Sequence, residues 1–185
     1  VGSNAFRNGS GSDNSIFGSY AGNNLGGGNA NTLIGSDAGY YLSGASASNV
    51  VIGSSAAASV VTGTMSNGTI IGTGAGSAIN GGDNNVLIGY QAGNNITSGD
   101  NNIVLGYDID VASATGSNQL NIGGLLQSTN YATGDLTIGT SDTTGQLLVL
   151  DTKTGAGDPT GANGGMYYNS NSNKFRCYQN GSWTD

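Results

Sequence analysis

The sequence lacks two residue types on which much enzyme chemistry depends. Its 185 residues include no histidine and no glutamate, so all 11 acidic residues are aspartates. Catalysis needs an acid, a base or a nucleophile of tuned pKa. The one close acidic pair in the repeats, Asp108 and Asp110, is more typical of solvated turn residues than of a catalytic pair. We therefore expect no catalytic residues, no enzyme activity and no cofactor.

Basic residues and cysteine are also scarce. Lysine and arginine together number 4 against 11 aspartates, which gives a net charge of −7. This excess of acid disfavours nucleic acid and anionic membrane surfaces as partners. No apolar run approaches the ~18 residues of a membrane span, and no signal peptide is recognisable after Val1. The single cysteine, Cys177, excludes an internal disulfide framework.

Glycine, by contrast, is abundant and regularly spaced. It supplies 35 of the 185 residues, against a usual share of ~7%. One glycine recurs at intervals of 17, 18, 19, 17, 17, 17 and 16 residues, and we call these positions the repeat glycines: Gly18, Gly35, Gly53, Gly72, Gly89, Gly106, Gly123 and Gly139. So steady a period is typical of a solenoid.

Each repeat has the pattern of a short β-strand. The stretch from Asn85 to Gly93 reads Asn-Val-Leu-Ile-Gly-Tyr-Gln-Ala-Gly, with a polar residue, three strand-forming residues and a turn glycine. No helical period is present. The sequence predicts an all-β fold, a parallel β-solenoid of about eight ~17-residue coils with equivalent strands ~4.8 Å apart.

Two apolar rows precede the repeat glycines, and successive strand residues face opposite sides. The residue just before each glycine is predicted to fill the lumen: Phe17, Ile34, Ile52, Ile71, Ile88, Leu105, Ile122 and Ile138. The residue two before it is predicted to point outward and form an oligomer interface: Ile16, Leu33, Val51, Ile70, Leu87 and Val104. An outward apolar stripe of that length needs a cover, and another copy of the chain is the simplest one.

The two ends of the chain differ from the repeats. Val1 to Ala5 matches a repeat from its last apolar residue onward, so we expect the chain to begin partway through a coil: either more coils preceded it, or another subunit completes the first rung. We divide the chain into a solenoid (1–140), a strand with a glycine-rich linker (141–164) and a C-terminal β-hairpin element (165–185). An unpaired first rung could receive another subunit's strand. The hairpin element, too small to bury a core alone, carries the predicted assembly residues Tyr167, Phe175, Tyr178 and Trp183.

Two aspartates occupy equivalent turns. Asp83 and Asp100 are 17 residues apart, so stacked coils would place their carboxylates ~5 Å from each other. Calcium prefers such oxygen clusters, although the nonapeptide pattern of calcium-binding β-rolls is absent. Solvated turn caps are the interpretation we favour, with calcium as the alternative.

The repeats resemble those of known fibre proteins. Asn31-Thr32-Leu33-Ile34-Gly35 with Ala38, and the stretch from Asn85 to Gly93, are similar to head repeats of trimeric autotransporter adhesins and to repeats of phage tail fibres. The tail from Met166 to Trp183 resembles the ends of such fibres and, more weakly, the trimerisation foldon of a phage fibritin. The resemblance implies left-handed winding and a homotrimer.

These features favour a structural role outside the cell. We expect an extracellular fibre protein, on a cell or a virion, that forms homotrimers, assembles head to tail, and serves surface projection or adhesion. The alternative is a receptor- or glycan-binding fibre tip that uses tyrosines such as Tyr40, Tyr41, Tyr167 and Tyr168.

Overall fold

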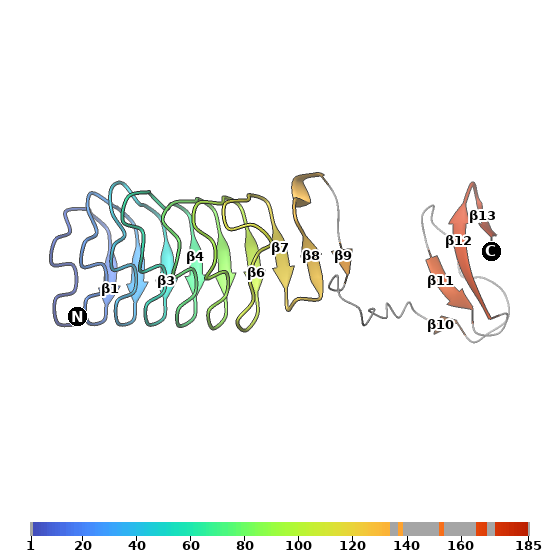
Figure 1. Ribbon diagram of the computed structural model, residues 1–185, viewed down its shortest axis with the longest axis horizontal. Helices are drawn as coiled ribbons and strands as arrows, with labels where there is room; N and C mark the ends of the chain where they lie inside the picture. Colours follow the sequence, from blue (N-terminus) through green and yellow to red (C-terminus); the bar gives the residue numbers. More distant parts are fainter. Residues whose placement is uncertain (1, 134–136, 139–151, 154–165, 170–172, 185) are drawn as a thin grey trace. The chain divides into compact units, whose positions relative to one another are not determined.

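The protein forms two compact units. The computed structural model describes residues 2–133, 137–138, 152–153, 166–169 and 173–184 (Figure 1). The units are Val1–Gly145 and Gln146–Asp185, so their boundary lies close to the end of the expected solenoid at residue 140. The strand and glycine-rich linker expected at 141–164 lie outside the described residues, apart from 152–153.

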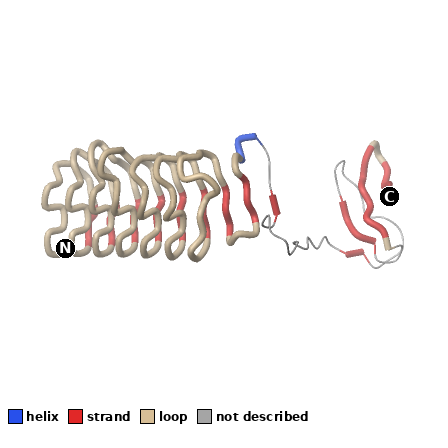
Figure 2. The backbone as a smooth tube through the Cα atoms, viewed as in Figure 1, coloured by secondary structure: helices blue, strands red, loops and turns tan. Residues whose placement is uncertain are grey.

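The first unit is the predicted parallel β-solenoid. Each coil contributes one three-residue strand: β1 (Ser15–Phe17), β2 (Thr32–Ile34), β3 (Val50–Ile52), β4 (Thr69–Ile71), β5 (Val86–Ile88), β6 (Ile103–Leu105) and β7 (Leu120–Ile122). Neighbouring strands are parallel and in register, so Leu33 pairs with Ile16 on one side and with Val51 on the other. The strands line one side of the coils, and turns and loops form the rest (Figure 2).

The solenoid has about six turns rather than the eight expected. After β7 the chain reverses at Gly123 and Gly124, which have positive φ angles of 60° and 72°. β8 (Leu126–Ser128) then pairs antiparallel with β7, and β9 (Thr137–Ile138) pairs antiparallel with β8. A short 3-10 helix, η1 (Tyr131–Thr133), lies between them. The residues Thr137 and Ile138 of the expected eighth repeat therefore belong to a returning strand and not to another coil.

The interior is filled from three apolar rows. One is the residue two before the repeat glycine, the second is the alanine three after it, and the third is the large residue seven after it. Their fully buried members are Leu33, Val51, Ile70, Leu87, Val104, Ala21, Ala38, Ala56, Ala75, Ala92, Leu25, Leu42, Val60, Ile79 and Ile96. This dense lumen is the hydrophobic core of the unit.

The structure reverses the two strand rows. The predicted interface row, from Leu33 to Val104, lies in the lumen, with the first member, Ile16, partly buried against it. The predicted lumen row faces outward: Phe17, Ile34 and Ile88 are exposed, and Ile52, Ile71, Leu105 and Ile122 are half-buried. The eighth member, Ile138, lies in β9, and its side chain is outside the described residues. Strand alternation separates two faces but does not say which one a closing coil turns inward.

The repeat glycines are needed for two reasons, a positive φ angle and a close contact with the backbone of the next coil. Gly53 has a φ of +138°, and a Cβ built there would lie 2.4 Å from the carbonyl oxygen of Gly72 in the next coil. An L residue would be strained by that φ and would clash with backbone. Each coil therefore needs one such glycine where it stacks on the next coil, and this explains the regular spacing of the repeat glycines.

A ladder of buried asparagines runs beside the apolar core. Its members lie four residues before the repeat glycines, on the same strand face as the lumen row. Asn49 donates from Nδ2 to Oδ1 of Asn31 at 2.9 Å and to the Met65 carbonyl at 2.7 Å, and its own Oδ1 accepts the Gly68 N–H at 2.8 Å. Asn102 and Gln119 continue the pattern, since the Gln119 N–H donates to Asn102 Oδ1 at 2.9 Å.

The asparagine ladder is interrupted at Gly68, and the side chain of Met65 compensates for the missing asparagine. Gly68 occupies an asparagine position, and the buried Met65 lies three residues before it. In the coil of Asn85, the place of Met65 is taken by Gly82, where a Cβ would lie 2.4 Å from the Gly99 carbonyl oxygen and 3.1 Å from Asn85 Nδ2. The methionine side chain therefore fills the space that an asparagine takes in other coils.

The first described residues are in register with the coils that follow. The Tyr20 N–H donates to the Ser3 carbonyl at 2.8 Å, as the Asp37 N–H does to Ser19 at 2.9 Å. The Phe6 side chain packs against the core at this end. The expected partial coil before Gly18 is therefore present.

The second unit contains a four-stranded sheet. β10 (Thr152–Lys153) pairs parallel with β11 (Met166–Asn169), and β11, β12 (Lys174–Gln179) and β13 (Ser182–Thr184) form an antiparallel meander. Asn180 and Gly181 both have positive φ, as expected for a tight hairpin turn. The predicted C-terminal hairpin strands are confirmed, whereas β10 was not predicted.

Candidate functional surfaces

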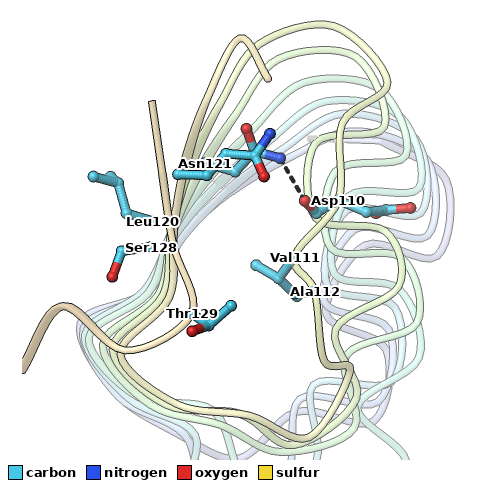
Figure 3. A pocket seen from close by; sticks show the side chains of 8 residues that line it. Asp110, Val111, Ala112, Leu120, Asn121, Ser128 and Thr129 are labelled. Carbon is cyan, nitrogen blue, oxygen red and sulfur yellow. Dashed lines mark hydrogen bonds between the residues drawn. The ribbon is translucent and has the colours of Figure 1, made fainter. Parts of the chain in front are cut away.

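The most extensive candidate is the outer face of the parallel sheet. We define the outer sheet face as the residues one and three before the repeat glycine in β1–β7: Phe17, Ile34, Ile52, Ile71, Ile88, Leu105, Ile122, Ser15, Thr32, Val50, Thr69, Val86, Ile103 and Leu120. Phe17 is 64% exposed, Ile34 39% and Ile88 38%. Figure 3 shows the same alternation in β7, where Leu120 points away from the interior and Asn121 points into it.

Charge is absent from the outer sheet face. Among the described residues of the solenoid, the charged side chains are Arg7, Asp13, Asp37, Asp83, Asp100, Asp108 and Asp110. All of them lie in turns and loops and none in strands β1–β7. The face is therefore an apolar stripe, polar only at some of its outer positions such as Ser15 and Thr32.

Exposed tyrosines gather at two places on the solenoid. Tyr90 and Tyr107 stack with ring centroids 5.1 Å apart and planes 18° apart, next to the repeat glycines Gly89 and Gly106. Tyr20, Tyr40 and Tyr41 form a second group, which we call the tyrosine cluster. Its ring centroids are 6.1 Å apart for Tyr20 and Tyr40, and 4.5 Å apart for Tyr40 and Tyr41.

The sequence points to Tyr40 and Tyr41 but not to their partner Tyr20. Tyr20 lies in the preceding coil, at a different place relative to its repeat glycine, so the repeat pattern does not connect the three residues. Tyr168, named with them, lies in the other unit, where its ring centroid is 5.1 Å from that of Phe175.

The equivalent aspartates Asp83 and Asp100 accept hydrogen bonds from backbone N–H groups. Asp83 Oδ1 accepts the Ser66 N–H at 2.8 Å, and Asp100 Oδ1 accepts the Asp83 N–H at 2.8 Å. Each carboxylate thus caps a backbone donor of the preceding coil. Within the described residues no group of three or more His, Cys, Asp or Glu side chains could hold a metal ion, and two carboxylates are fewer than the six to eight oxygens that calcium takes.

The C-terminal sheet has aromatic pairs on both faces. Register places Met166, Tyr168, Phe175 and Cys177 on one face, with Met166 58% and Phe175 59% exposed. Tyr178 and Trp183 pair across the other face with ring centroids 5.2 Å apart. Of the four predicted assembly residues, the structure therefore joins Tyr178 with Trp183 and puts Phe175 on the opposite face; the side chain of Tyr167 lies outside the described residues.

A small cavity of about 140 Å³ lies where the coils end (Figure 3). Its lining residues come from the last coil and the returning strand: Asp110, Val111, Ala112, Leu120, Asn121, Gln127, Ser128 and Thr129. Asn121 holds the lumen position of β7, donates to the Asp110 carbonyl at 2.6 Å and accepts the Gly124 N–H at 2.9 Å. The apolar lumen therefore ends in satisfied polar groups, and this is the physical reason the repeat pattern changes at Asn121.

Comparison with known proteins adds no identification. No protein-family model, no curated protein and no solved structure matches the chain. In the part of the chain that the structure describes, no helix has the length and apolar character to traverse a bilayer. Function therefore has to be argued from the surfaces described above.

Proposed function

We propose that this chain is a structural extracellular fibre protein whose solenoids associate side by side through the outer sheet face. The observation that carries the proposal is the row Phe17 to Ile122, an apolar residue on every rung of an exposed sheet. Six steps of ~4.8 Å make this stripe about 29 Å long. Monomeric proteins rarely leave so long an apolar stripe in water.

The occupant that fits this face best is the same face of other copies. Both surfaces then have the same rung spacing, so side chains of one ladder can interdigitate with those of the next at every rung. Each copy has a net charge of −7, and the absence of charge from the face lets copies approach without like charges in contact. A homotrimer with left-handed coils is the arrangement that the resemblance to adhesin-head and tail-fibre repeats implies.

The experiment compares one charged substitution on this face with a matched one elsewhere. Ile88→Lys puts a charge on the outer sheet face, and Val61→Lys puts one at a loop residue that is 51% exposed. In sedimentation velocity we expect the wild type and Val61→Lys to sediment with the mass of three chains, and Ile88→Lys as a monomer with an unchanged circular dichroism spectrum. A monomeric wild type, or a trimeric Ile88→Lys variant, contradicts the proposal.

Head-to-tail growth of the trimers into filaments, through the first coil and the C-terminal unit, is a further part of the proposal. Projection from a surface and adhesion are the roles that such a filament would serve. Negative-stain electron microscopy of the purified protein distinguishes the two assemblies: continuous filaments support axial growth, and discrete short rods contradict it.

A further inference from the structure

Tyr40 and Tyr41 lie on the coil wall opposite the sheet, and Tyr20, in the turn that follows β1, brings its ring to within 6.1 Å of that of Tyr40. Tyr40 and Tyr41 are the fifth and sixth residues after a repeat glycine, as Val111 and Ala112 are in their coil. Figure 3 shows Asp110, Val111 and Ala112 across the interior from β7. Asn95, also a sixth residue, donates from Nδ2 to the Val111 carbonyl at 2.8 Å, so such residues of successive coils stack along this wall. Association through the outer sheet face would leave the cluster accessible.

The rings of the cluster are exposed although nothing in their coils requires them to be aromatic. Tyr41 is 43% and Tyr20 39% exposed, and Tyr40 is half-buried between them. Other described residues at the fifth and sixth places are aliphatic, small or carry amides: Asn23, Asn24, Ala58, Ser59, Ser77, Ala78, Asn94, Asn95, Val111 and Ala112. The solenoid therefore stacks well without aromatic rings here, which leaves the cluster free for a role outside the core.

Backbone hydrogen bonds fix the main chain beneath the cluster. The Tyr20 N–H donates to the Ser3 carbonyl at 2.8 Å, and the Tyr41 N–H donates to the Ala58 carbonyl at 3.3 Å. Tyrosine side chains have only two rotatable angles, so a ligand that contacts them costs little ordering of the protein. The ring planes are tilted by 43° between Tyr20 and Tyr40 and by 76° between Tyr40 and Tyr41, so the three rings form a faceted aromatic platform with polar hydroxyl groups.

Side-chain amides border the platform. The Asn24 N–H donates to the Tyr40 carbonyl at 3.0 Å, so Asn24 is the neighbour of Tyr40 in the wall. Asn24 Oδ1 accepts from Asn8 Nδ2 at 2.9 Å, while among the described residues Asn24 Nδ2 donates to no protein acceptor. An available amide donor thus lies beside an aromatic surface.

We propose that Tyr20, Tyr40, Tyr41 and Asn24 bind a neutral hexopyranose unit of a polysaccharide. The apolar C–H face of a pyranose ring packs on aromatic faces, and its hydroxyl groups need polar partners at the edge of such a platform. Asp37 has the same place in its coil as Tyr20 in the preceding one, and its N–H donates to the Ser19 carbonyl at 2.9 Å, so its carboxylate disfavours an anionic sugar. The proposal does not depend on self-association, because all four residues belong to one chain and none of them is part of the outer sheet face.

Affinity electrophoresis tests this site directly. The net charge of −7 carries the native protein toward the anode, through gels that contain dextran, laminarin, galactomannan or xyloglucan as the probe. We expect at least one polysaccharide to retard the wild type. Tyr41→Ala and Asn24→Ala should each weaken that retardation by about threefold or more, and Tyr41→Phe, which keeps the ring, should stay within about twofold of the wild type.

Tyr107→Ala is the matched control. Tyr107 is 75% exposed but belongs to the other tyrosine pair, so its removal should leave retardation unchanged. Each variant is first shown to keep the wild-type circular dichroism spectrum and melting temperature; Asn24→Ala leaves all three rings in place if Tyr41→Ala does not fold. The inference is overturned if no polysaccharide retards the wild type, if Asn24→Ala and Tyr41→Ala migrate as the wild type does, or if Tyr107→Ala loses retardation equally.

Discussion

Single asparagines link neighbouring coils in a way that no apolar residue could. Asn49 is fully buried, yet its amide group contacts Asn31 in the preceding coil and the Met65 and Gly68 backbone of the following one. Buried polar groups are stabilising only when all their partners are present. The ladder therefore fixes the stacking register as well as contributing to stability.

Replacing Asn49 with alanine should destabilise the solenoid strongly. The variant leaves the Met65 carbonyl and the Gly68 N–H without their side-chain partner in a buried site, and we expect a loss of about 3 kcal/mol in the free energy of unfolding. Asn8→Ala is the control, because Asn8 is exposed, and its effect should stay within about 0.5 kcal/mol. Urea denaturation measures both, and equal effects would show that the ladder is not a stabilising element.

The sequence reveals the asparagine period but not its burial. In the sequence, Asn14, Asn31 and Asn49 have the pattern of strand boundaries, because asparagine is typical of turns. Their even spacing from the lumen row puts them on the inward face, and this was the available signal for which face is buried. The sequence does not predict that Met65 compensates for Gly68 at an asparagine position. The space that the Met65 side chain fills is defined only once the coil has folded.

At the level of elements, each three-residue strand has one inward position and two outward ones. The sequence predicts the strands, their parallel register and the C-terminal hairpin, because these follow from period and turn residues. It does not predict which row faces the lumen, because both rows are large and apolar. Nor does it predict the antiparallel return at β8, which depends on the left-handed pair Gly123 and Gly124 replacing a coil turn.

Two alanine substitutions in β2 test the corrected assignment of faces. Leu33 is fully buried and Ile34 is 39% exposed. Leu33→Ala should cost about 2–5 kcal/mol at any protein concentration, because it opens a cavity in the lumen. In dilute solution, Ile34→Ala should lower the free energy of unfolding by less than about 1 kcal/mol. If copies cover the outer sheet face, this loss should grow as the protein concentration rises. Urea denaturation at several protein concentrations distinguishes the two variants. If Ile34→Ala were the more destabilising one in dilute solution, the row of Ile34 would face the lumen after all.

At the scale of the whole molecule, the net charge is −7 and the described part of the solenoid carries its aspartates on turns and its apolar stripe on strands, so assembly should depend on salt in a defined direction. Copies with a net charge of −7 repel each other at long range, while an uncharged contact face gains nothing from ion pairs. Salt screens the repulsion within a Debye length of ~8 Å at 0.15 M. Raising sodium chloride from about 0.02 to about 0.5 M should therefore strengthen association, by roughly tenfold in apparent association constant, in sedimentation velocity.

The response to pH provides the internal control for that measurement. With no histidine in the chain, the side chain that most often titrates near neutrality is missing. Association measured at constant salt should therefore change little between about pH 6 and pH 8. Weaker association at high salt would instead mean that ion pairs hold the copies together, and the contact would then have to lie on the turns that carry the aspartates, away from the outer sheet face.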